Sequence, residues 1–209
     1  PISMEVLETS EIGVSAAAQE AADVLSRGGI VLFPTDTLYG LAVDVRDAAA
    51  VARLIALKGR DVGKAISVIL PSASEIGNYA DVSDKARRLI EKHLPGPLTL
   101  VLPIKNKDLL YLAADGTIGI RVPNDPFTLE LGGAFNAPYT ATSANVSGKS
   151  TLSSIPEILT QFGASANMID LVIDAGPRVG GVGSTVVRVI GEEIEILREG
   201  ALTASDLGL

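Results

Sequence analysis

The sequence predicts an α/β fold whose sheet contains both parallel and antiparallel strands. Short apolar runs typical of strands alternate with helical periodicities through most of the 209 residues. The order is not a strict βαβ repeat, and two alternating segments flank Gly191-Glu192 as in a hairpin. Hydrophobic residues make up 47% and charged residues 20%, so a sizeable core is expected, and residues 1–209 are predicted to form one domain.

The first 70 residues predict two helices and three strands. An Ala-rich helix ends at Gly28-Gly29, because glycine supplies the backbone freedom that a helix C-terminus needs. Asp47 has the side chain of an N-cap, and it precedes a helix with Val51 and Leu54 on one face. In chain order we expect a helix over 15–27, strands over 30–33 and 41–45, the helix that follows Asp47, and a strand over 65–70.

The rest of the chain continues the alternation. An amphipathic helix ends at Leu94-Pro95-Gly96, since proline and glycine interrupt the helical pattern. Ser154-Ile155-Pro156-Glu157 has the spacing of a capping box, so a helix is expected to begin there. In chain order we expect a helix over 83–93, strands over 98–102 and 117–122, a helix over 127–135, the helix after Ser154, a strand over 171–173, and hairpin strands over 184–190 and 193–198.

The absence of particular residue types excludes several kinds of chemistry. Without cysteine the chain has no disulfide, thiolate metal site or cysteine nucleophile. His93 is the only histidine, so no metal-ligating residues are predicted, and aromatic residues, at 4%, are few for stacking exposed bases. No apolar run approaches the roughly 18 residues of a membrane span and no export signal is visible. A cytoplasmic protein that does not contact a membrane is therefore expected.

The charge is unevenly distributed along the chain. The net charge of −8 argues against a generally basic nucleic-acid binder. Residues 53–107 carry ten Lys or Arg against five acidic residues, which gives +5 there and −13 elsewhere. A local basic zone suits a small anionic ligand, and the alternative for residues 85–92 is a solvated helix face.

Polar residues follow the first predicted strand at residues 34–40. Ligands of open α/β sheets bind beyond strand ends, where loops present hydroxyls and backbone amides. Thr35, Thr37 and Tyr39 are therefore candidates for orienting a small polar substrate. The alternative is a turn whose Thr and Asp side chains satisfy their own backbone.

Two cations lie close together in Lys58-Gly59-Arg60, and Lys64 follows. Gly59 allows a tight turn, so Lys58 and Arg60 can converge on one polyphosphate, one as a point charge and the other as a bidentate fork. The alternative is that cations near a helix C-terminus simply complement the helix dipole.

Two further segments are predicted as loops. Residues 140–148 combine small hydroxyl and amide side chains that can bind phosphate, ribose or carboxylate oxygens, or form an ordinary turn. Residues 176–183 are rich in glycine and form either a cover over a site or an ordinary loop. Neither matches a Walker loop or the dinucleotide fingerprint.

Together these segments resemble the YrdC-like family of L-threonylcarbamoyladenylate synthases. Eight motifs occur in the family's order across nearly the whole chain, so chance agreement is implausible. They are Gly28-Gly29, residues 34–41, Lys58-Gly59-Arg60, residues 94–99, residues 119–123, residues 142–145, residues 183–186 and residues 197–200. The resemblance implies an α/β fold in which a twisted mixed parallel/antiparallel sheet, flanked by helices, surrounds a large concave cavity lined with positive charge.

The reaction implied by the resemblance joins L-threonine, bicarbonate or CO2, and ATP into threonylcarbamoyl-AMP and releases pyrophosphate. The product serves modification of the tRNA adenosine next to the anticodon, through a separate threonylcarbamoyl transferase complex. Mg²⁺ is expected to accompany ATP. Lys58 and Arg60 are the implied catalytic residues, because they would neutralise the departing pyrophosphate.

The resemblance also implies the substrate contacts. Arg121 is expected to pair with the carboxylate of threonine. Positioning and charge neutralisation supply much of the acceleration in such transfers, so no strongly basic side chain is required. The implied ATP contacts are Lys58, Arg60, Lys64, Thr117, Ser143, Asn145, Thr151 and Arg198, and the implied threonine contacts are Thr35, Arg121, Thr142 and Ser184.

The chain departs from the family pattern at two positions. Many members have proline at the position of Ala65, and some have a threonine-contacting histidine at the position of Ile69. The chain ends soon after Arg198-Glu199-Gly200, so the short, single-domain form is expected. Two alternatives stay open: a tRNA- or double-stranded-RNA-binding module of the same fold, and a subgroup of the same fold without synthase activity.

Overall fold

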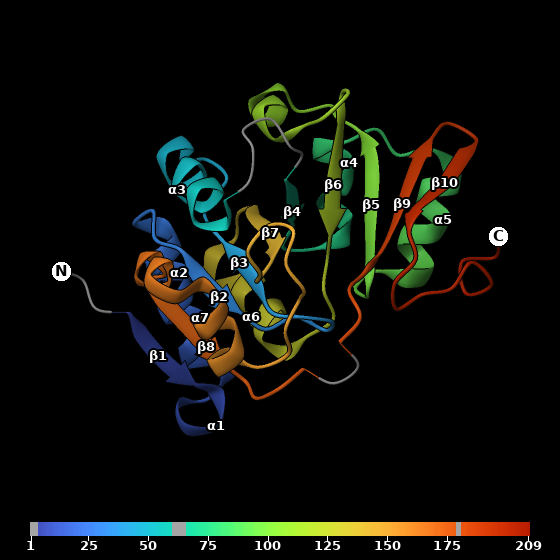
Figure 1. The fold of residues 1–209 in the computed structure, drawn as a ribbon. Coiled ribbons are helices and arrows are strands. Elements are labelled where there is room, and N and C mark those ends of the chain that lie inside the picture. Colours follow the sequence, from blue (N-terminus) through green and yellow to red (C-terminus); the bar gives the residue numbers. More distant parts are fainter. Residues whose placement is uncertain (1–3, 60–65, 179–180) are drawn as a thin grey trace.

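One open mixed sheet extends across the molecule (Figure 1). The structure is a computed structural model that describes residues 4–59, 66–178 and 181–209, and ten strands pair within these residues. From edge to edge the strands are β1 (Glu5–Glu8), β8 (Leu171–Asp174), β2 (Val31–Phe33), β3 (Gly40–Ala42), β7 (Tyr139–Ser143), β4 (Ser67–Ile69), β6 (Thr117–Arg121), β5 (Leu98–Pro103), β9 (Thr185–Ile190) and β10 (Glu193–Arg198).

The strand directions confirm the predicted mixed sheet. β1, β8 and β2 run parallel to one another, whereas β3 is antiparallel to both β2 and β7. β7 is antiparallel to β4, β4 is parallel to β6, and β5 is antiparallel to β6 and parallel to β9. The predicted hairpin of β9 and β10 is also confirmed. The sheet does not close, so β1 and β10 are its two edges.

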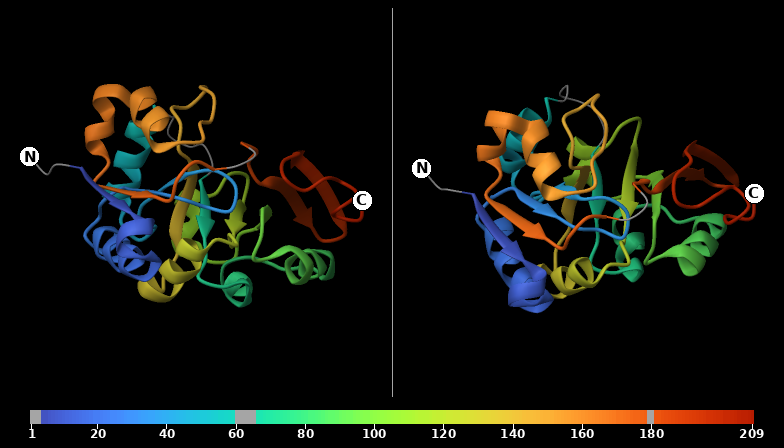
Figure 2. Two further views of the ribbon diagram at one scale, coloured as in Figure 1. Left: turned by 90° about the horizontal axis from the view of Figure 1, so that it is seen from below. Right: turned by 60° about the horizontal axis from the view of Figure 1, so that its bottom comes forward.

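Helices cover both faces of the sheet (Figure 2). One face carries α2 (Val14–Ser26), α4 (Ile76–Tyr79), α5 (Asp84–His93) and α6 (Pro126–Phe135), and the other carries α3 (Ala48–Lys58) and α7 (Ile155–Phe162). The shorter helices are α1 (Thr9–Ile12), η1 (Ala73–Glu75), η2 (Lys107–Leu112) and η3 (Gly163–Met168). None of the helices in the described part of the chain combines the length and apolar character needed to cross a lipid bilayer.

Local signals explain where the predicted helices begin and end. The Asp47 carboxylate accepts a hydrogen bond from the Ala50 amide at 3.0 Å, and so caps α3 as expected. Ser83 caps α5 in the same way through the Ala86 amide at 3.2 Å. Gly59 ends α3 in the left-handed region at φ 66°, which favours glycine. This cap directs the chain out of the helix immediately after Lys58.

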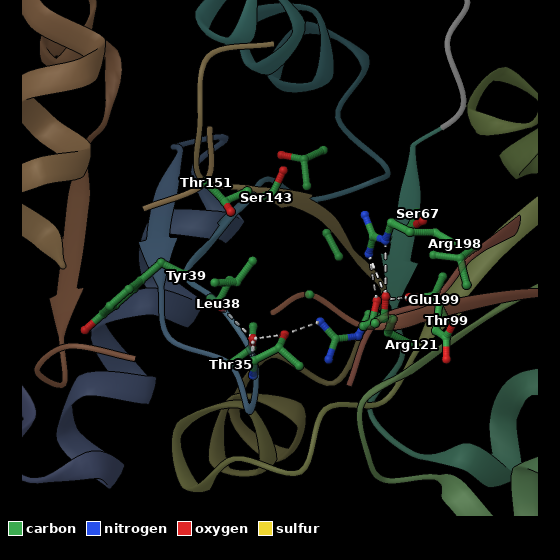
Figure 3. A pocket seen from close by; sticks show the side chains of 17 residues that line it. Thr35, Leu38, Tyr39, Ser67, Thr99, Arg121, Ser143, Thr151, Arg198 and Glu199 are labelled. Atoms are coloured by element: carbon green, nitrogen blue, oxygen red, sulfur yellow. Dashed lines mark hydrogen bonds between the residues drawn. The ribbon is translucent and has the colours of Figure 1, made fainter. Parts of the chain in front are cut away.

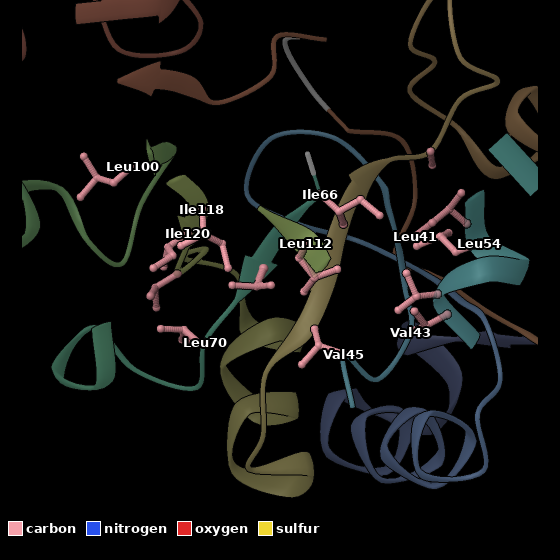
Figure 4. Packing of buried hydrophobic residues seen from close by; sticks show 14 of the residues in the cluster. Leu41, Val43, Val45, Leu54, Ile66, Leu70, Leu100, Leu112, Ile118 and Ile120 are labelled. Carbon is pink, nitrogen blue, oxygen red and sulfur yellow. The ribbon is translucent and has the colours of Figure 1, made fainter. Parts of the chain in front are cut away.

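The core packs on both sides of the sheet. On one side, Phe33 and Tyr139 meet edge to face with ring centroids 5.7 Å apart, beneath α2 and α6. Figure 4 shows the other cluster, in which Leu54 of α3 lies against Leu41 of β3. That cluster continues through Leu100 and Ile120 toward the β5 side of the sheet. The strands that carry the polar cavity described below are therefore held by fully buried side chains.

The structure corrects four details of the sequence prediction. Residues 140–143 were expected in a loop but form most of the central strand β7, where the Val43 amide donates to Thr140 Oγ1 at 2.9 Å. β1 was not predicted because its sequence is polar and it lies at the sheet edge. β3 ends at Ala42, although Asp44 still forms an isolated bridge with Tyr139. α7 begins after Ser154 as expected, but the Ser154 side chain forms no capping hydrogen bond.

Candidate active site

A cavity of about 400 Å³ opens between the two halves of the sheet (Figure 3). Its walls come from the loop before β3 and from β4, β5, β6, β7, β9 and β10. The lining includes seven of the predicted site residues: Thr35, Arg121, Thr142, Ser143, Thr151, Ser184 and Arg198. Residues from distant parts of the sequence therefore meet in one hollow.

Lys58 and Ser143 contact each other directly beside this cavity. Lys58 is buried at the end of α3, and its Nζ donates to the Ser143 carbonyl oxygen. Ser143 ends β7, and its hydroxyl donates to Asn145 Oδ1. The Asn145 amide group in turn donates to the carbonyl of Lys149 at 2.9 Å. Three of the predicted ATP contacts thus form one connected cluster of a cation, a hydroxyl and an amide.

Arg198 fixes the opposite wall of the cavity. Its guanidinium donates to the Ser184 carbonyl through Nη2 at 2.8 Å and through Nε at 3.2 Å. The Ser184 hydroxyl shares a 2.7 Å hydrogen bond with the hydroxyl of Thr99 on β5. Arg198 remains solvent-exposed, so this cation is accessible to an anion in the cavity.

Arg121 forms a buried ion pair with Asp36. Arg121 Nη2 lies 2.7 Å from Asp36 Oδ1, and the side chains are only 10% and 11% exposed. The second Asp36 oxygen accepts from the Asn124 amide at 2.9 Å, which fixes the carboxylate on the loop before β3. Burial lowers the pKa of the Arg121 guanidinium, while the charge of Asp36 raises it. Because arginine titrates so far above neutrality, Arg121 stays protonated.

Two buried polar atoms of the cavity wall lack a protein partner. Arg121 Nε and Thr142 Oγ1 are both shielded from solvent and make no hydrogen bond. Buried polar groups in folded proteins are almost always hydrogen-bonded, so two unpaired atoms in one cavity wall are candidates for pairing with a bound molecule when the wall adjusts to it. One donor and one hydroxyl are therefore available for a carboxylate or a polar group of a bound molecule.

The hydroxyls of Thr35 and Tyr39 are used within the protein. Thr35 Oγ1 donates to the Leu38 carbonyl at 2.5 Å and accepts from the Thr37 amide at 3.1 Å. Tyr39 OH donates to the Gly176 carbonyl at 2.6 Å, and Figure 3 shows it turned away from the cavity. The suggestion that Tyr39 orients a substrate through its hydroxyl is therefore wrong. The alternative of a turn that satisfies its own backbone describes this loop.

The remaining predicted residues are not all brought to the cavity. Thr117 lies at the far end of β6, four residues from Arg121, and its hydroxyl donates to the Ala114 carbonyl at 2.8 Å. At about 3.3 Å per residue this places it roughly 13 Å along the strand. Its hydroxyl donates within a turn and can still accept a hydrogen bond, so the predicted contact of Thr117 with ATP stays a prediction. Arg60, Lys64 and Ala65 lie outside the described residues, and predictions for them stay predictions.

The sequence interpretation did not assign roles to several residues of the site. Asp36 lies inside the motif over residues 34–40, but nothing in the sequence indicated its pairing with Arg121. Ser67 and Thr99 line the cavity from β4 and β5, where strand alternation gave the only signal. Glu199 is the acidic residue among the described residues that line the cavity. Among residues 4–59, 66–178 and 181–209, no group of three or more His, Cys, Asp or Glu side chains is placed to hold a metal.

The basic residues of α5 form a solvated face. Lys85 Nζ lies 3.8 Å from Glu192, and Arg87 lies 3.9 Å from Asp84. None of these four residues lines the cavity. The structure therefore favours the solvated-face interpretation of this part of the basic zone.

The fold and the site define a class of protein: a domain with an open mixed sheet that binds small charged ligands in a central cavity lined by arginine and hydroxyl groups. The model of the family Sua5_yciO_yrdC, described as "Telomere recombination", matches residues 23–200, and the chain belongs to this family. The expected resemblance is thus confirmed.

Individual relatives agree with this assignment. The chain is 36% identical over 180 residues to the "Putative threonylcarbamoyl-AMP synthase" of Methanocaldococcus jannaschii, covering 86% of this chain and 84% of that protein. Among solved structures it resembles P. abyssi Sua5 complexed with L-threonine, with a TM-score of 0.85 and 29% identity. That match covers 98% of this chain but 59% of the other. E. coli YciO gives a TM-score of 0.85 at 25% identity and 98% coverage of both chains.

Proposed function

We propose that this chain is a threonylcarbamoyl-AMP synthase. It forms threonylcarbamoyl-AMP and pyrophosphate from L-threonine, bicarbonate or CO2, and ATP. The observation that carries the proposal is the meeting of Arg121 and Thr142, both with unpartnered polar atoms, and the Lys58–Ser143 cluster around one cavity. The curated names of its relatives describe the same reaction.

The threonine site centres on Arg121. Asp36 occupies Nη2 and leaves Nε free to donate to the carboxylate of the amino acid. Thr142 Oγ1 offers a hydrogen bond to its remaining polar groups, and Ser184 lines the same wall with its hydroxyl bonded to Thr99. Thr35 contributes through the shape of its loop, since its hydroxyl is already used. The relative whose structure is complexed with L-threonine supports L-threonine as the ligand of such a site.

The ATP site lies on the Ser143 side of the cavity. Lys58, Ser143 and Asn145 form its cluster, Thr151 and Arg198 line the wall, and Arg60 and Lys64 are assigned to it from the sequence. Mg²⁺ enters with ATP as part of the substrate. Its ligands are then the phosphate oxygens, a role that fits a cavity whose described lining contains one acidic residue, Glu199.

The reaction brings two anions together. The amine of threonine adds to CO2 and loses a proton to give a carbamate, and a carbamate oxygen then attacks the α-phosphorus as pyrophosphate leaves. Arg121 holds the amino acid, while Lys58 and Arg60 offset the charge of the departing pyrophosphate. Because the residues position and neutralise the reactants, the site needs no strong base.

The biological role follows from the product. Threonylcarbamoyl-AMP is a reactive mixed anhydride, and a separate threonylcarbamoyl transferase complex consumes it to modify the tRNA adenosine next to the anticodon. We place this activity in the cytoplasm and in a single domain over residues 1–209. Direct RNA binding is not part of the proposal, because the net charge is −8 and two of the basic residues of α5, Lys85 and Arg87, lie beside acidic residues.

The decisive experiment measures pyrophosphate release by the purified chain with Mg²⁺ and ATP. Release should require both L-threonine and bicarbonate, and mass spectrometry should detect threonylcarbamoyl-AMP. Lys58→Met should lower kcat/KM by at least about 100-fold, whereas the control Lys105→Met, at an exposed cation outside the cavity, should leave it unchanged. Pyrophosphate release that is independent of threonine would overturn the proposal.

A further inference from the structure

Arg178 connects four separate parts of the chain behind the threonine site. Its Nη1 donates to the Thr35 carbonyl at 3.3 Å and to Asp125 Oδ1 at 3.4 Å. Its Nη2 donates to the Ala175 carbonyl at 2.8 Å, and its guanidinium lies 5.5 Å from the centroid of the Tyr39 ring. The backbone amide of Arg178 also donates to the Ser153 carbonyl at 2.8 Å. One side chain therefore joins the loop before β3, the start of α6 and the segment after β8.

The loop over residues 34–40 is held from two sides. Toward the cavity, Asp36 pairs with Arg121 at 2.7 Å. On the other side, Arg178 holds the Thr35 carbonyl and packs on the Tyr39 ring. Arg178 itself does not line the cavity, and its guanidinium nitrogens donate to Thr35, Asp125 and Ala175. It acts on the site only through the position of the loop.

The surroundings of Arg178 favour a fixed geometry. Its side chain is 19% exposed, and the side chain of its partner Asp125 is 9% exposed. The second Asp125 oxygen caps α6 by accepting from the Phe127 amide at 2.9 Å. Burial raises the pKa of Asp125, while the α6 amides and Arg178 lower it. A planar fork that donates in several directions suits this junction, whereas a lysine ammonium on a flexible stem does not reproduce it.

We infer that Arg178 is a positioning residue for the amino-acid site: by anchoring the Thr35 carbonyl to Asp125 at the start of α6, it sets the place of Asp36 and hence of Arg121. This inference rests on the proposed function, because it concerns the same amino-acid substrate. It assigns a role to the segment after β8, whose sequence indicated only a cover or an ordinary loop. Loss of Arg178 should therefore weaken the use of threonine more than the use of ATP.

The chain offers a control arginine with similar interactions in a more exposed place. Arg46 also pairs with a carboxylate, Asp44, at 2.9 Å, and its guanidinium lies 5.6 Å from the Phe135 ring. This arginine follows the opposite end of β3 and does not line the cavity. The two arginines thus combine the same two interactions, but only Arg178 also contacts the loop over residues 34–40.

The test compares Arg178→Met, Arg178→Lys, Arg46→Met and the double variant Arg178→Met/Asp125→Asn in the full chain. For each variant, steady-state pyrophosphate release gives separate KM values for threonine and ATP, and calorimetry gives the Kd of L-threonine without turnover. Arg178→Met should raise the threonine KM and Kd by about tenfold, with the ATP KM within about twofold. Arg178→Lys should fall between Arg178→Met and the wild type, and Arg46→Met should match the wild type.

The double variant separates positioning from stability. Asp125→Asn removes the carboxylate that Arg178→Met leaves buried without its ion-pair partner, so the melting temperature should recover at least in part. The threonine KM should nevertheless remain high, because the Thr35 carbonyl stays unanchored. The inference is overturned if this KM recovers with stability, or if Arg178→Met raises both KM values equally or matches Arg46→Met. Failure of the wild type to release pyrophosphate in a threonine-dependent way would instead overturn the proposed function, and the calorimetric Kd would still test Arg178.

Discussion

Asp36→Ala should destabilise the protein strongly for a single surface-loop substitution. The change removes an acceptor at 2.7 Å from Arg121 Nη2 and another at 2.9 Å from the Asn124 amide. It leaves a guanidinium that is 10% exposed without its counterion. Breaking a buried pair typically costs 3–5 kcal/mol, and because this pair borders a cavity that admits water, we expect about 3 kcal/mol. For a chain of this size that corresponds to a fall in Tm of roughly 6–12 °C.

The control for this prediction is Asp44→Ala. Asp44 and Arg46 are 2.9 Å apart, but the Arg46 side chain is 63% exposed and becomes solvated when its partner is removed. The expected loss is below about 1 kcal/mol. Differential scanning calorimetry of both variants and of the double variant Asp36→Ala/Arg121→Met measures the difference, and the double variant should recover part of the loss. If the Tm of Asp36→Ala lies within about 2 °C of the Tm of Asp44→Ala, which corresponds to about half a kcal/mol, the reasoning about the buried pair is wrong.

Three further changes test other parts of the site. Burial raises the pKa of Tyr39 to about 12, so the phenol keeps its proton to higher pH in the folded state than in the unfolded state. The stability that this shift contributes is complete below pH 10 and is lost as pH rises toward 12. Denaturant titrations at several pH values should show that Tyr39→Phe removes this loss. Thr142→Val removes a buried hydroxyl without a partner, so the free energy of unfolding of the unliganded protein, measured by chemical denaturation, should rise by up to about 1 kcal/mol. The KM for threonine should also rise, and an unchanged KM would exclude Thr142 from the site. Gly200→Ala should lower the free energy of unfolding by about 2 kcal/mol, because the new Cβ would lie 2.3 Å from the Gly183 carbonyl oxygen. In the control Gly133→Ala, in α6, the new Cβ meets no atom, so this variant should be neutral or stabilising. Equal Tm values for the two variants would contradict this.

The helices could be predicted because their signals are local. Asp47 and Ser83 cap the helices that follow them, and Gly59 ends α3, with no help from distant residues. β7 could not be predicted in the same way, since Tyr139–Ser143 contains no apolar run and its place depends on pairing with β3 and β4. A polar strand of this kind is recognised only once its partners are known.

In the site, too, local motifs could be predicted from the sequence and long-range contacts could not. The basic motif at Lys58 and the hydroxyl motif at Ser143 were visible in the sequence, and the structure joins them through a hydrogen bond. The roles of Asp36 and Arg178 depend on contacts with residues more than 50 positions away, and no spacing in the sequence encodes them. The hydroxyl of Thr35 illustrates the converse, because a plausible substrate contact is used to shape its own loop.

The position of β7 in the middle of the sheet has a consequence for synthesis of the protein on the ribosome. Gly40 pairs with Ser143 and Ser67 with Ala141, so the edges of β3 and β4 await a strand that emerges much later. Arg198 and Ser184 complete the opposite wall only when the chain is almost finished. Nascent chains therefore expose unpaired strand edges for most of translation, which favours misassociation, and nucleotide or amino acid can stabilise the fold only after release of nearly the full length.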